Sequence, residues 1–246
     1  MLDLVDYRKG RWQDVIGDVQ ADHLIIDAPY SARTHAGGYK GDAQGVGFRK
    51  AVNDFYSAWG QKEVAEVCQW AKDHIAQWVV SMTDHYLFSV WEQELAARGY
   101  YVFAPVVLVE TGRGVRLGGD GPACWSTSIV VARPRTREAA SWRALPGAYI
   151  VPRSTDKMMG GKPLDAMRQI VRDYSDPGDT IVDLCAGNAT TLLAAAMEGR
   201  RAIGCEVNPQ TWETGNERLR SRLYMPLFDG AHVQSNLWGG LSHARF

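Results

Sequence analysis

The spacing of apolar and polar residues divides the chain into short apolar runs and longer stretches with helical periodicity. The apolar runs have the length of buried strands, and in the longer stretches apolar residues recur every three or four positions. The predicted strands are residues 23–27, 78–82, 105–110, 128–132, 180–184 and 201–206, and the predicted helices are residues 63–75, 87–98, 163–174 and 190–198. Strands that alternate with helices predict a mostly parallel sheet covered by helices on both faces.

A glycine-containing loop follows the predicted strand at 180–184 and has the sequence Asp183-Leu-Cys-Ala-Gly-Asn-Ala-Thr190. A tight turn between a strand and a helix N-terminus is a typical place for a nucleoside-like ligand. Glu206 ends the next strand 23 residues after Asp183. This is close to the spacing of roughly 20 residues at which an acidic side chain holds a ribose diol. The alternative is a generic crossover whose glycine only fits a turn.

The segment Asp27-Ala-Pro-Tyr30 lies at the carboxyl end of another predicted strand. An exocyclic amino group of adenine or cytosine is a poor nucleophile because its lone pair is delocalised into the ring. The Asp27 carboxylate and the Ala28 carbonyl could each accept one N–H and so expose that lone pair. Pro29 would stiffen the turn, and Tyr30 offers a flat face for an extruded base. A plain strand-to-turn connection is the alternative.

Together these segments resemble the beta-class DNA amino-methyltransferases, which methylate N6 of adenine or N4 of cytosine and in which the catalytic motif precedes the cofactor motif. Asp27–Tyr30 is similar to the family motif (Asp/Ser/Asn)-Pro-Pro-(Tyr/Phe/Trp). Gly161-Lys-Pro-Leu164 resembles the family's Lys-Pro segment, residues 175–191 resemble the lead into its cofactor loop, and residues 199–206 resemble the strand with the ribose-binding acid. The likeness covers residues from about 20 to 220.

The resemblance implies an α/β fold of the Rossmann-like S-adenosylmethionine-dependent methyltransferases, with a mostly parallel seven-stranded sheet, one antiparallel strand and a circularly permuted motif order. It implies one methyltransferase domain over residues 1–246 and S-adenosylmethionine as cofactor. The residues expected to serve catalysis are Asp27, Ala28, Pro29 and Tyr30. The residues expected to bind the cofactor are Asp27, Lys162, Asp183, Cys185, Ala186, Gly187, Asn188, Thr190, Thr191 and Glu206.

Two residues depart from the family pattern. Ala28 stands where the motif has its first proline, but it keeps the backbone carbonyl, so rigidity is affected more than chemistry. Ala189 stands where the cofactor loop has its last glycine. Because alanine does not readily adopt positive φ, the loop is expected to differ in shape or to bind the cofactor less tightly.

The expected activity is methyl transfer to N6 of adenine in a base flipped out of DNA, because an aspartate at the first motif position favours adenine within the family. An N4-cytosine DNA methyltransferase is the alternative among enzymes, and RNA is a weaker alternative substrate. A catalytically inert nucleic-acid-binding subunit of a larger complex is the alternative outside them. The presence of Asp27, Tyr30, Lys162 and Glu206 argues against that last interpretation.

Basic residues gather in two segments that flank these motifs. Residues 133–157 include six basic and two acidic residues, and residues 31–50 include four basic residues and one acidic residue. We interpret 133–161 as a short insertion with little secondary structure that contacts DNA phosphates, and 31–50 as a loop over the flipped base. The residues expected to contact DNA are Arg33, Lys40, Arg135 and Arg137. A short or degenerate target sequence follows, although a solvated charged face is the alternative.

Composition narrows the class of protein. A net charge of −1 gives no global electrostatic signal for nucleic acid. The four cysteines form no CxxC pair, which is typical of reduced thiols in a cytoplasmic protein, and the six histidines lie at no metal-ligand spacing. No apolar run has the length of a membrane span. We therefore expect a cytoplasmic protein without membrane or metal partners, with DNA and a second copy of the chain as candidate partners.

Overall fold

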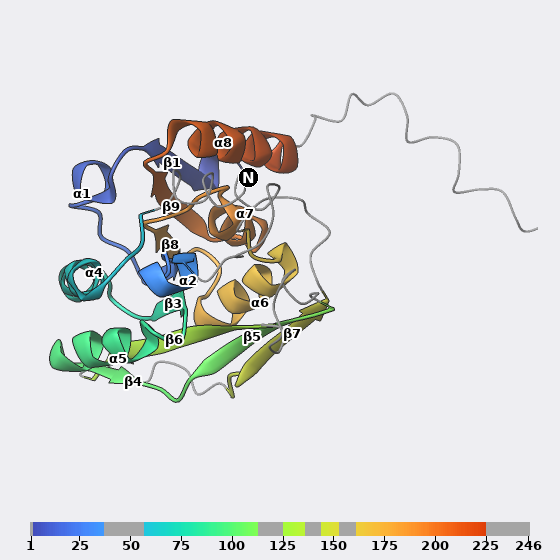
Figure 1. The fold of residues 1–246 in the computed structure, drawn as a ribbon. Coiled ribbons are helices and arrows are strands. Elements are labelled where there is room, and N and C mark those ends of the chain that lie inside the picture. The colour runs from blue at the N-terminus through green and yellow to red at the C-terminus, as the bar shows by residue number, and fades with distance from the viewer. Residues whose placement is uncertain (1, 37–56, 113–124, 136–143, 153–160, 225–246) are drawn as a thin grey trace, which may run out of the picture.

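A mixed sheet of nine strands forms the centre of the protein (Figure 1). The computed structural model describes residues 2–36, 57–112, 125–135, 144–152 and 161–224. The strands are β1 (Val5–Lys9), β2 (His23–Asp27), β3 (Val79–Thr83), β4 (Tyr100–Val102), β5 (Val106–Thr111), β6 (Ser126–Pro134), β7 (Ala148–Pro152), β8 (Thr180–Asp183) and β9 (Arg201–Glu206). Their order is β1-β9-β8-β2-β3-β6-β5-β7, and β4 pairs with β6.

Strand β6 is the reversed strand of this sheet. It is antiparallel to β3, β4 and β5, whereas the other paired strands run parallel. The predicted α/β class, the mostly parallel sheet and the single reversed strand are confirmed. The described sheet has nine strands and not the expected seven.

Helices cover both faces of the sheet (Figure 1). One face carries α6 (Leu164–Tyr174), α7 (Thr190–Met197) and α8 (Pro209–Leu223), and the other carries α1 (Trp12–Val15), α4 (Gln61–His74) and α5 (Phe88–Ala97). Alternate residues of a strand enter the two cores, as strand geometry requires. In β2, for example, Ile25 packs in the core beneath α6 and α7, while Leu24 and Ile26 pack in the core beneath α4 and α5.

The segment 133–161 was predicted to have little secondary structure, and this was wrong for part of it. Strand β7 occupies residues 148–152 of this segment and pairs in parallel with β5. Tyr149 and Val151 are buried, while Ala148 and Ile150 are exposed. This two-residue alternation is the signature of an edge strand with one buried face.

The parallel strands bring their carboxyl ends to one edge of the sheet. We call this the carboxyl edge: it includes Asp27 at the end of β2, Thr83 at the end of β3, Asp183 at the end of β8 and Glu206 at the end of β9. Strand β6 runs the other way, so it begins at this edge, near Thr127. Ligands of open α/β sheets bind at this edge. We call the opposite edge, where β2 and β8 begin, the amino edge.

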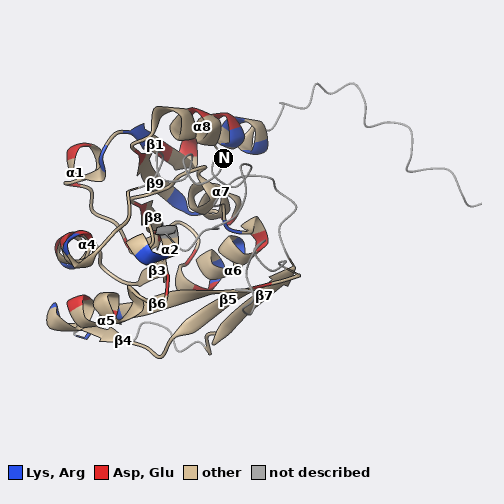
Figure 2. Cartoon of the chain, viewed as in Figure 1, with Lys and Arg blue, Asp and Glu red and all other residues tan. Residues whose placement is uncertain are grey.

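Charged residues of both signs lie mainly on the helices and turns (Figure 2). Within the described residues, none of the helices combines the length and the apolar character that crossing a membrane requires.

Candidate active site

Asp27 and Lys162 form an ion pair at the carboxyl edge. Lys162 Nζ donates to Asp27 Oδ1 at 2.7 Å and to Oδ2 at 2.6 Å. The Lys162 side chain is 9% exposed and that of Asp27 is 23% exposed. The pair joins the turn after β2 to the loop before α6. Lys162 was expected to bind the cofactor, and its contact with Asp27 was not predicted from the sequence.

Tyr30 lies beside the same ammonium group. Lys162 Nζ is 5.2 Å from the centroid of the Tyr30 ring, so one face of the ring is close to a positive charge. The Tyr30 hydroxyl is buried near Lys162 and Thr127, although none of the described residues meets it with full hydrogen-bond geometry. Burial raises the pKa of Tyr30, and the Lys162 charge opposes that rise. Burial would lower the pKa of Lys162, but the Asp27 carboxylate outweighs it and the pKa is raised.

Asp84, the residue after β3, fixes the segment that follows the Asp27–Tyr30 turn. Its Oδ2 accepts hydrogen bonds from the Ser31 amide at 2.9 Å, the Ser31 hydroxyl at 2.6 Å and the Thr34 hydroxyl at 2.5 Å. Its Oδ1 accepts from the amides of Tyr86 and Leu87 before α5. Burial would raise the pKa of Asp84, but these hydrogen bonds outweigh it and lower the pKa.

Sequence analysis missed Asp84. The available signal was an aspartate between a strand and a helix, a position at which its side chain accepts backbone N–H groups. Through Ser31 and Thr34 it also anchors α2 (Ala32–Ala36), the helix that follows the catalytic turn.

The loop between β8 and α7 has two residues in the left-handed conformation. Gly187 has φ +52°, and Ala189 has φ +60° and ψ 31°. The expectation that Ala189 would avoid positive φ was therefore wrong. The Ala189 amide donates to the Ala186 carbonyl at 2.7 Å, and this hydrogen bond closes the turn. For an alanine this conformation costs about 1–2 kcal/mol, so the surrounding contacts must hold it.

Two carboxylates flank this loop. Asp183 is fully buried, and its Oδ1 accepts from the Cys185 amide at 3.0 Å, while its Oδ2 has no hydrogen-bond partner in the described structure. Burial raises the pKa of Asp183 to about 7, and the charges of Asp27 and Glu206 add to the rise. Glu206 Oε1 accepts from the Asn208 amide at 2.7 Å. Burial also raises the pKa of Glu206.

The other residues expected to bind the cofactor belong to the same loop and the start of α7. Burial raises the pKa of the Cys185 thiol, so this residue lines the loop as a neutral group. The remaining members lie at the turn or the first turn of the helix: Ala186, Gly187, Asn188, Thr190 and Thr191.

These residues fit a ligand rich in hydroxyl and ammonium donors. The buried Oδ2 of Asp183 can accept a hydrogen bond from a ligand, and an unpaired buried polar atom costs about 1–3 kcal/mol without one. Glu206 stands at the end of the neighbouring strand β9, and the left-handed turn opens the N-terminus of α7. S-adenosylmethionine has such donors on its ribose and its methionine portion.

Two of the residues expected to contact DNA lie far apart. Arg33 is exposed on α2, and its guanidinium carbon is 4.7 Å from the Tyr86 ring centroid. Arg135 follows β6 at the amino edge, where its Nε donates to the Tyr100 carbonyl at 3.1 Å. Ile129 pairs with Met82, which pairs with Asp27, so Arg135 is six residues, roughly 20 Å, along the strand from the catalytic turn. Lys40 and Arg137 lie outside the described residues.

Two further observations delimit the site. In the described part of the chain no group of three or more His, Cys, Asp or Glu side chains could hold a metal ion. A surface hollow of about 400 Å³ lies at the amino edge, where Asp22, His74 and Thr180 contribute to its wall. None of the described residues predicted for the site lines that hollow.

Comparison with known proteins gives a family match for most of the chain. The family model described as DNA methylase, for N6 and N4 methyltransferases, matches residues 39–217. The chain is 33% identical over 81 residues to the DNA adenine methyltransferase YhdJ of Escherichia coli strain K12, a match that covers 33% of this chain and 28% of that protein. It is 39% identical over 49 residues to the type II methyltransferase M1.MboII of Moraxella bovis, covering 20% of this chain and 19% of that protein. The matches thus span less than a third of these curated relatives.

Solved structures share the fold over nearly the whole chain. The M1.HpyAVI–SAM complex has a TM-score of 0.65 at 15% identity and covers 87% of this chain and 99% of that chain. The PvuII DNA methyltransferase, described as cytosine-N4-specific, has a TM-score of 0.61 at 14% identity and covers 87% of this chain and 86% of that chain. At these identities the likeness establishes the fold.

Proposed function

Because the chain belongs to the DNA methylase family of N6 and N4 methyltransferases, we propose that it transfers a methyl group from S-adenosylmethionine to N6 of an adenine in DNA. The observation that carries this proposal is the Asp27 carboxylate at the carboxyl end of β2, with the buried carboxylate of Asp183 at the end of the adjacent strand β8. One acid serves the target amine and the other serves the cofactor.

Asp27 and the Ala28 carbonyl accept the two N–H groups of the target amine. This draws the nitrogen toward tetrahedral geometry and aims its lone pair at the methyl donor. When bound, S-adenosylmethionine supplies an electrophilic methyl group on a sulfonium sulfur. Asp27 places negative charge where the amine becomes cationic, and the surplus proton leaves through Asp27 or water. Much of the rate enhancement comes from holding the amine in line.

The ion pair with Lys162 orients the Asp27 carboxylate. A carboxylate offers about four lone-pair sites, and the ammonium uses one on each oxygen, so acceptor sites remain for the amine. Pro29 stiffens the turn, and the target base stacks on the Tyr30 face that Lys162 does not approach.

Asp183 and Glu206 hold the cofactor in this proposal. Glu206 accepts hydrogen bonds from the ribose hydroxyls, and the unpaired Oδ2 of Asp183 accepts from a further donor of the ligand. Gly187 and Asn188 provide the turn beside them, and Thr190 and Thr191 begin the helix that follows.

Adenine is favoured over cytosine on two grounds. Asp27 occupies the first position of the catalytic motif, and the curated relative from Escherichia coli is named as a DNA adenine methyltransferase. The N4-cytosine reaction is the second candidate, since the same two acceptors suit either amine and one structural neighbour is described as cytosine-N4-specific.

Nucleoside mass spectrometry on DNA from cells that express the chain tests the proposal. We expect N6-methyladenine with the unsubstituted chain and none with Asp27→Ala. N4-methylcytosine would instead establish the second candidate. Transfer of tritium from labelled S-adenosylmethionine to DNA by the purified chain excludes an inert subunit, and absence of transfer would contradict the proposal.

A further inference from the structure

The last described helix, α8, contacts the left-handed turn at Ala189 and holds it in place. Helix α8 packs beside β1 and α7 (Figure 1). Arg218 of this helix donates from Nη1 to the Asn188 carbonyl at 3.1 Å and to the Thr190 hydroxyl at 2.7 Å. These two acceptors belong to the residues immediately before and after Ala189. Arg218 therefore bridges the one described non-glycine residue with positive φ.

A second contact holds the same loop one residue earlier. Tyr7 of β1 donates from its hydroxyl to the Gly187 carbonyl at 2.5 Å. Tyr7 and Arg218 thus turn the carbonyls of two successive loop residues toward β1 and α8. Two successive carbonyls of the loop are therefore already engaged by the protein itself.

Gly215 allows α8 to come this close. A Cβ at this position would lie 3.0 Å from the Gly187 carbonyl oxygen and 3.0 Å from Tyr7 Cε1. Gly215 precedes Arg218 by three residues, so both lie on the helix face that packs against the loop. A glycine in the middle of a helix is unfavourable, and the close approach to the loop explains its presence here.

We propose that Arg218 is a positioning residue for the cofactor, which maintains the Ala189 turn in the conformation that binds it. Where related loops have glycine, this chain has alanine at 189 and a helix α8 residue that holds the turn. We call the two hydrogen bonds from Arg218 to Asn188 and Thr190 the clamp. Without the clamp Ala189 relaxes toward negative φ, and the fraction of molecules with a competent loop falls. The apparent affinity falls by that fraction. This inference rests on the proposed function for the identity of the ligand.

Calorimetry with S-adenosylhomocysteine tests the clamp. We expect Arg218→Met to weaken binding by about tenfold. In an Ala189→Gly background the same substitution should weaken binding less than about threefold, because glycine adopts the left-handed conformation without support. Arg218→Lys should give an intermediate loss, since an ammonium has donors for both acceptors but the lysine side chain is shorter by one bond than the path to Nη1. Arg220→Met is the matched control, because it removes the same charge from an exposed position of α8.

Rescue by Ala189→Gly separates this role from general support of the fold. Thermal unfolding without ligand, measured in parallel, reports the loss of packing in each variant. Equal losses of affinity with Ala189 present and in the Ala189→Gly background, or no loss at all, would overturn the inference while leaving the proposed function intact. Failure of the unsubstituted protein to bind S-adenosylhomocysteine would overturn the proposed function and the inference with it.

Discussion

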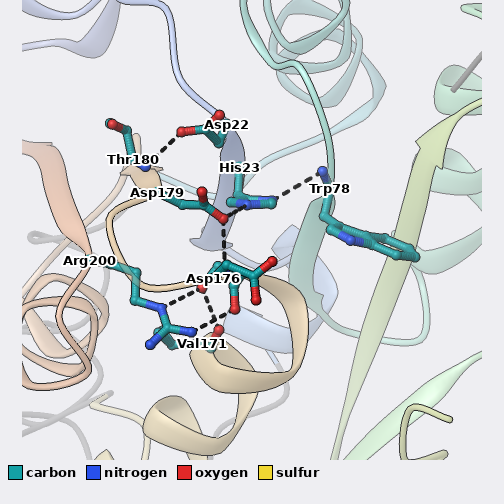
Figure 3. Close-up of polar contacts among 9 residues, drawn as sticks. Asp22, His23, Trp78, Val171, Asp176, Asp179, Thr180 and Arg200 are labelled. Atoms are coloured by element: carbon teal, nitrogen blue, oxygen red, sulfur yellow. Dashed lines mark hydrogen bonds and ion pairs between the residues drawn. The ribbon is translucent and has the colours of Figure 1, made fainter. Parts of the chain in front are cut away.

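The two edges of the parallel sheet both bury polar side chains, but they differ in how these are paired. At the amino edge His23 Nε2 lies 2.9 Å from Asp179 Oδ2, and Asp179 also accepts from the Asp176 amide (Figure 3). Arg200 donates there to the hydroxyl and the carbonyl of Ser175. At the carboxyl edge, Thr83 Oγ1 and Asp183 Oδ2 are buried without a partner among the described residues, whereas the other such atoms away from the Tyr30 turn belong to Trp91, Arg98 and Tyr100, on α5, just after it and at the start of β4.

This difference distinguishes buried polar groups that support the fold from those that the proposed function assigns to ligand binding. Buried polar groups are normally hydrogen-bonded, and a satisfied network makes the core rigid. An unpaired buried group is unfavourable unless a ligand supplies the missing partner. The satisfied network at the amino edge therefore supports the sheet, and the proposed function assigns ligand donors to the unpaired atoms of the carboxyl edge. Substitutions at the two edges should separate stability from activity.

The largest effect is expected from Asp27→Asn at the carboxyl edge. The amide keeps an acceptor oxygen, as the asparagine of some family motifs does, but it removes the negative charge that both the developing cation and the Lys162 ammonium face here, so kcat should fall by about a thousandfold. Methylation rates at saturating cofactor measure the loss.

A control is needed because Asp27→Asn leaves the Lys162 ammonium buried without its counter-charge. The double variant Asp27→Asn with Lys162→Met removes that penalty and should remain inactive although its unfolding midpoint recovers. Near-normal turnover in either folded variant would refute the assignment of Asp27.

The next largest effect is a change in the pH dependence of stability at Asp183. Its sign is opposite to that of an ordinary acidic residue in a folded protein. The pKa of Asp183 is about 7 in the fold, above the ordinary value of 3.8, so the folded state binds the proton more tightly than the unfolded state. The contribution of Asp183 to stability therefore decreases as pH rises from about 4 to about 7. Asp183→Asn does not ionise and should be more stable than the unsubstituted protein at pH 8, by on the order of 3 kcal/mol.

Urea unfolding at pH 8 and at about pH 3.5 checks this, and the difference between the two proteins should nearly vanish at the lower pH, which lies below the ordinary pKa of the group. The asparagine carbonyl can still accept from the Cys185 amide, so local geometry is kept. Binding of S-adenosylhomocysteine should weaken in the same variant. A variant less stable at pH 8 would show instead that the buried Asp183 carboxylate is stabilised by a favourable partner in the fold.

At the amino edge Arg200→Met should reduce stability without affecting chemistry. Arg200 is 4% exposed, and its loss leaves the Ser175 carbonyl without that donor. The free energy of unfolding should fall by about 2 kcal/mol, as measured in urea. Turnover per folded molecule should be unchanged. A fall in kcat at urea concentrations below the unfolding transition would contradict the distinction between the two edges.

The strands that carry the site were predictable, because each is a short apolar run that ends in a polar residue. β2 and β9 have the predicted bounds, and β8 ends one residue earlier than predicted. Helix α8 was not predicted, since several of its inward positions are small or polar. Thr211 and Gly215 take places where a periodicity search expects large apolar residues.

Contacts between distant segments could not be predicted from local patterns. The Lys-Pro segment was identified through its resemblance to a family, but nothing in its sequence indicates that Lys162 contacts Asp27, 135 residues away. Ala189 illustrates the same limit for backbone conformation. The preference of alanine for negative φ holds for an isolated residue, but it does not decide the conformation here. The turn overrides that preference through contacts from α8, which comes later in the chain.

The smallest predicted effect compares two arginines, one near each edge. Arg33 lies on α2, directly after the catalytic turn, whereas Arg135 is tied to the Tyr100 carbonyl at the amino edge. Both were expected to contact DNA, and that prediction stays untested. Their positions favour Arg33, since DNA whose flipped base reaches Asp27 must pass over the carboxyl edge. Arg33→Ala should weaken binding to every duplex and lower the magnitude of the salt slope by about 0.9, the value for one lost phosphate contact. Arg135→Ala should leave that slope unchanged. Fluorescence anisotropy with one labelled duplex over a salt series measures both, and a larger effect of Arg135→Ala would mean that DNA crosses the amino edge.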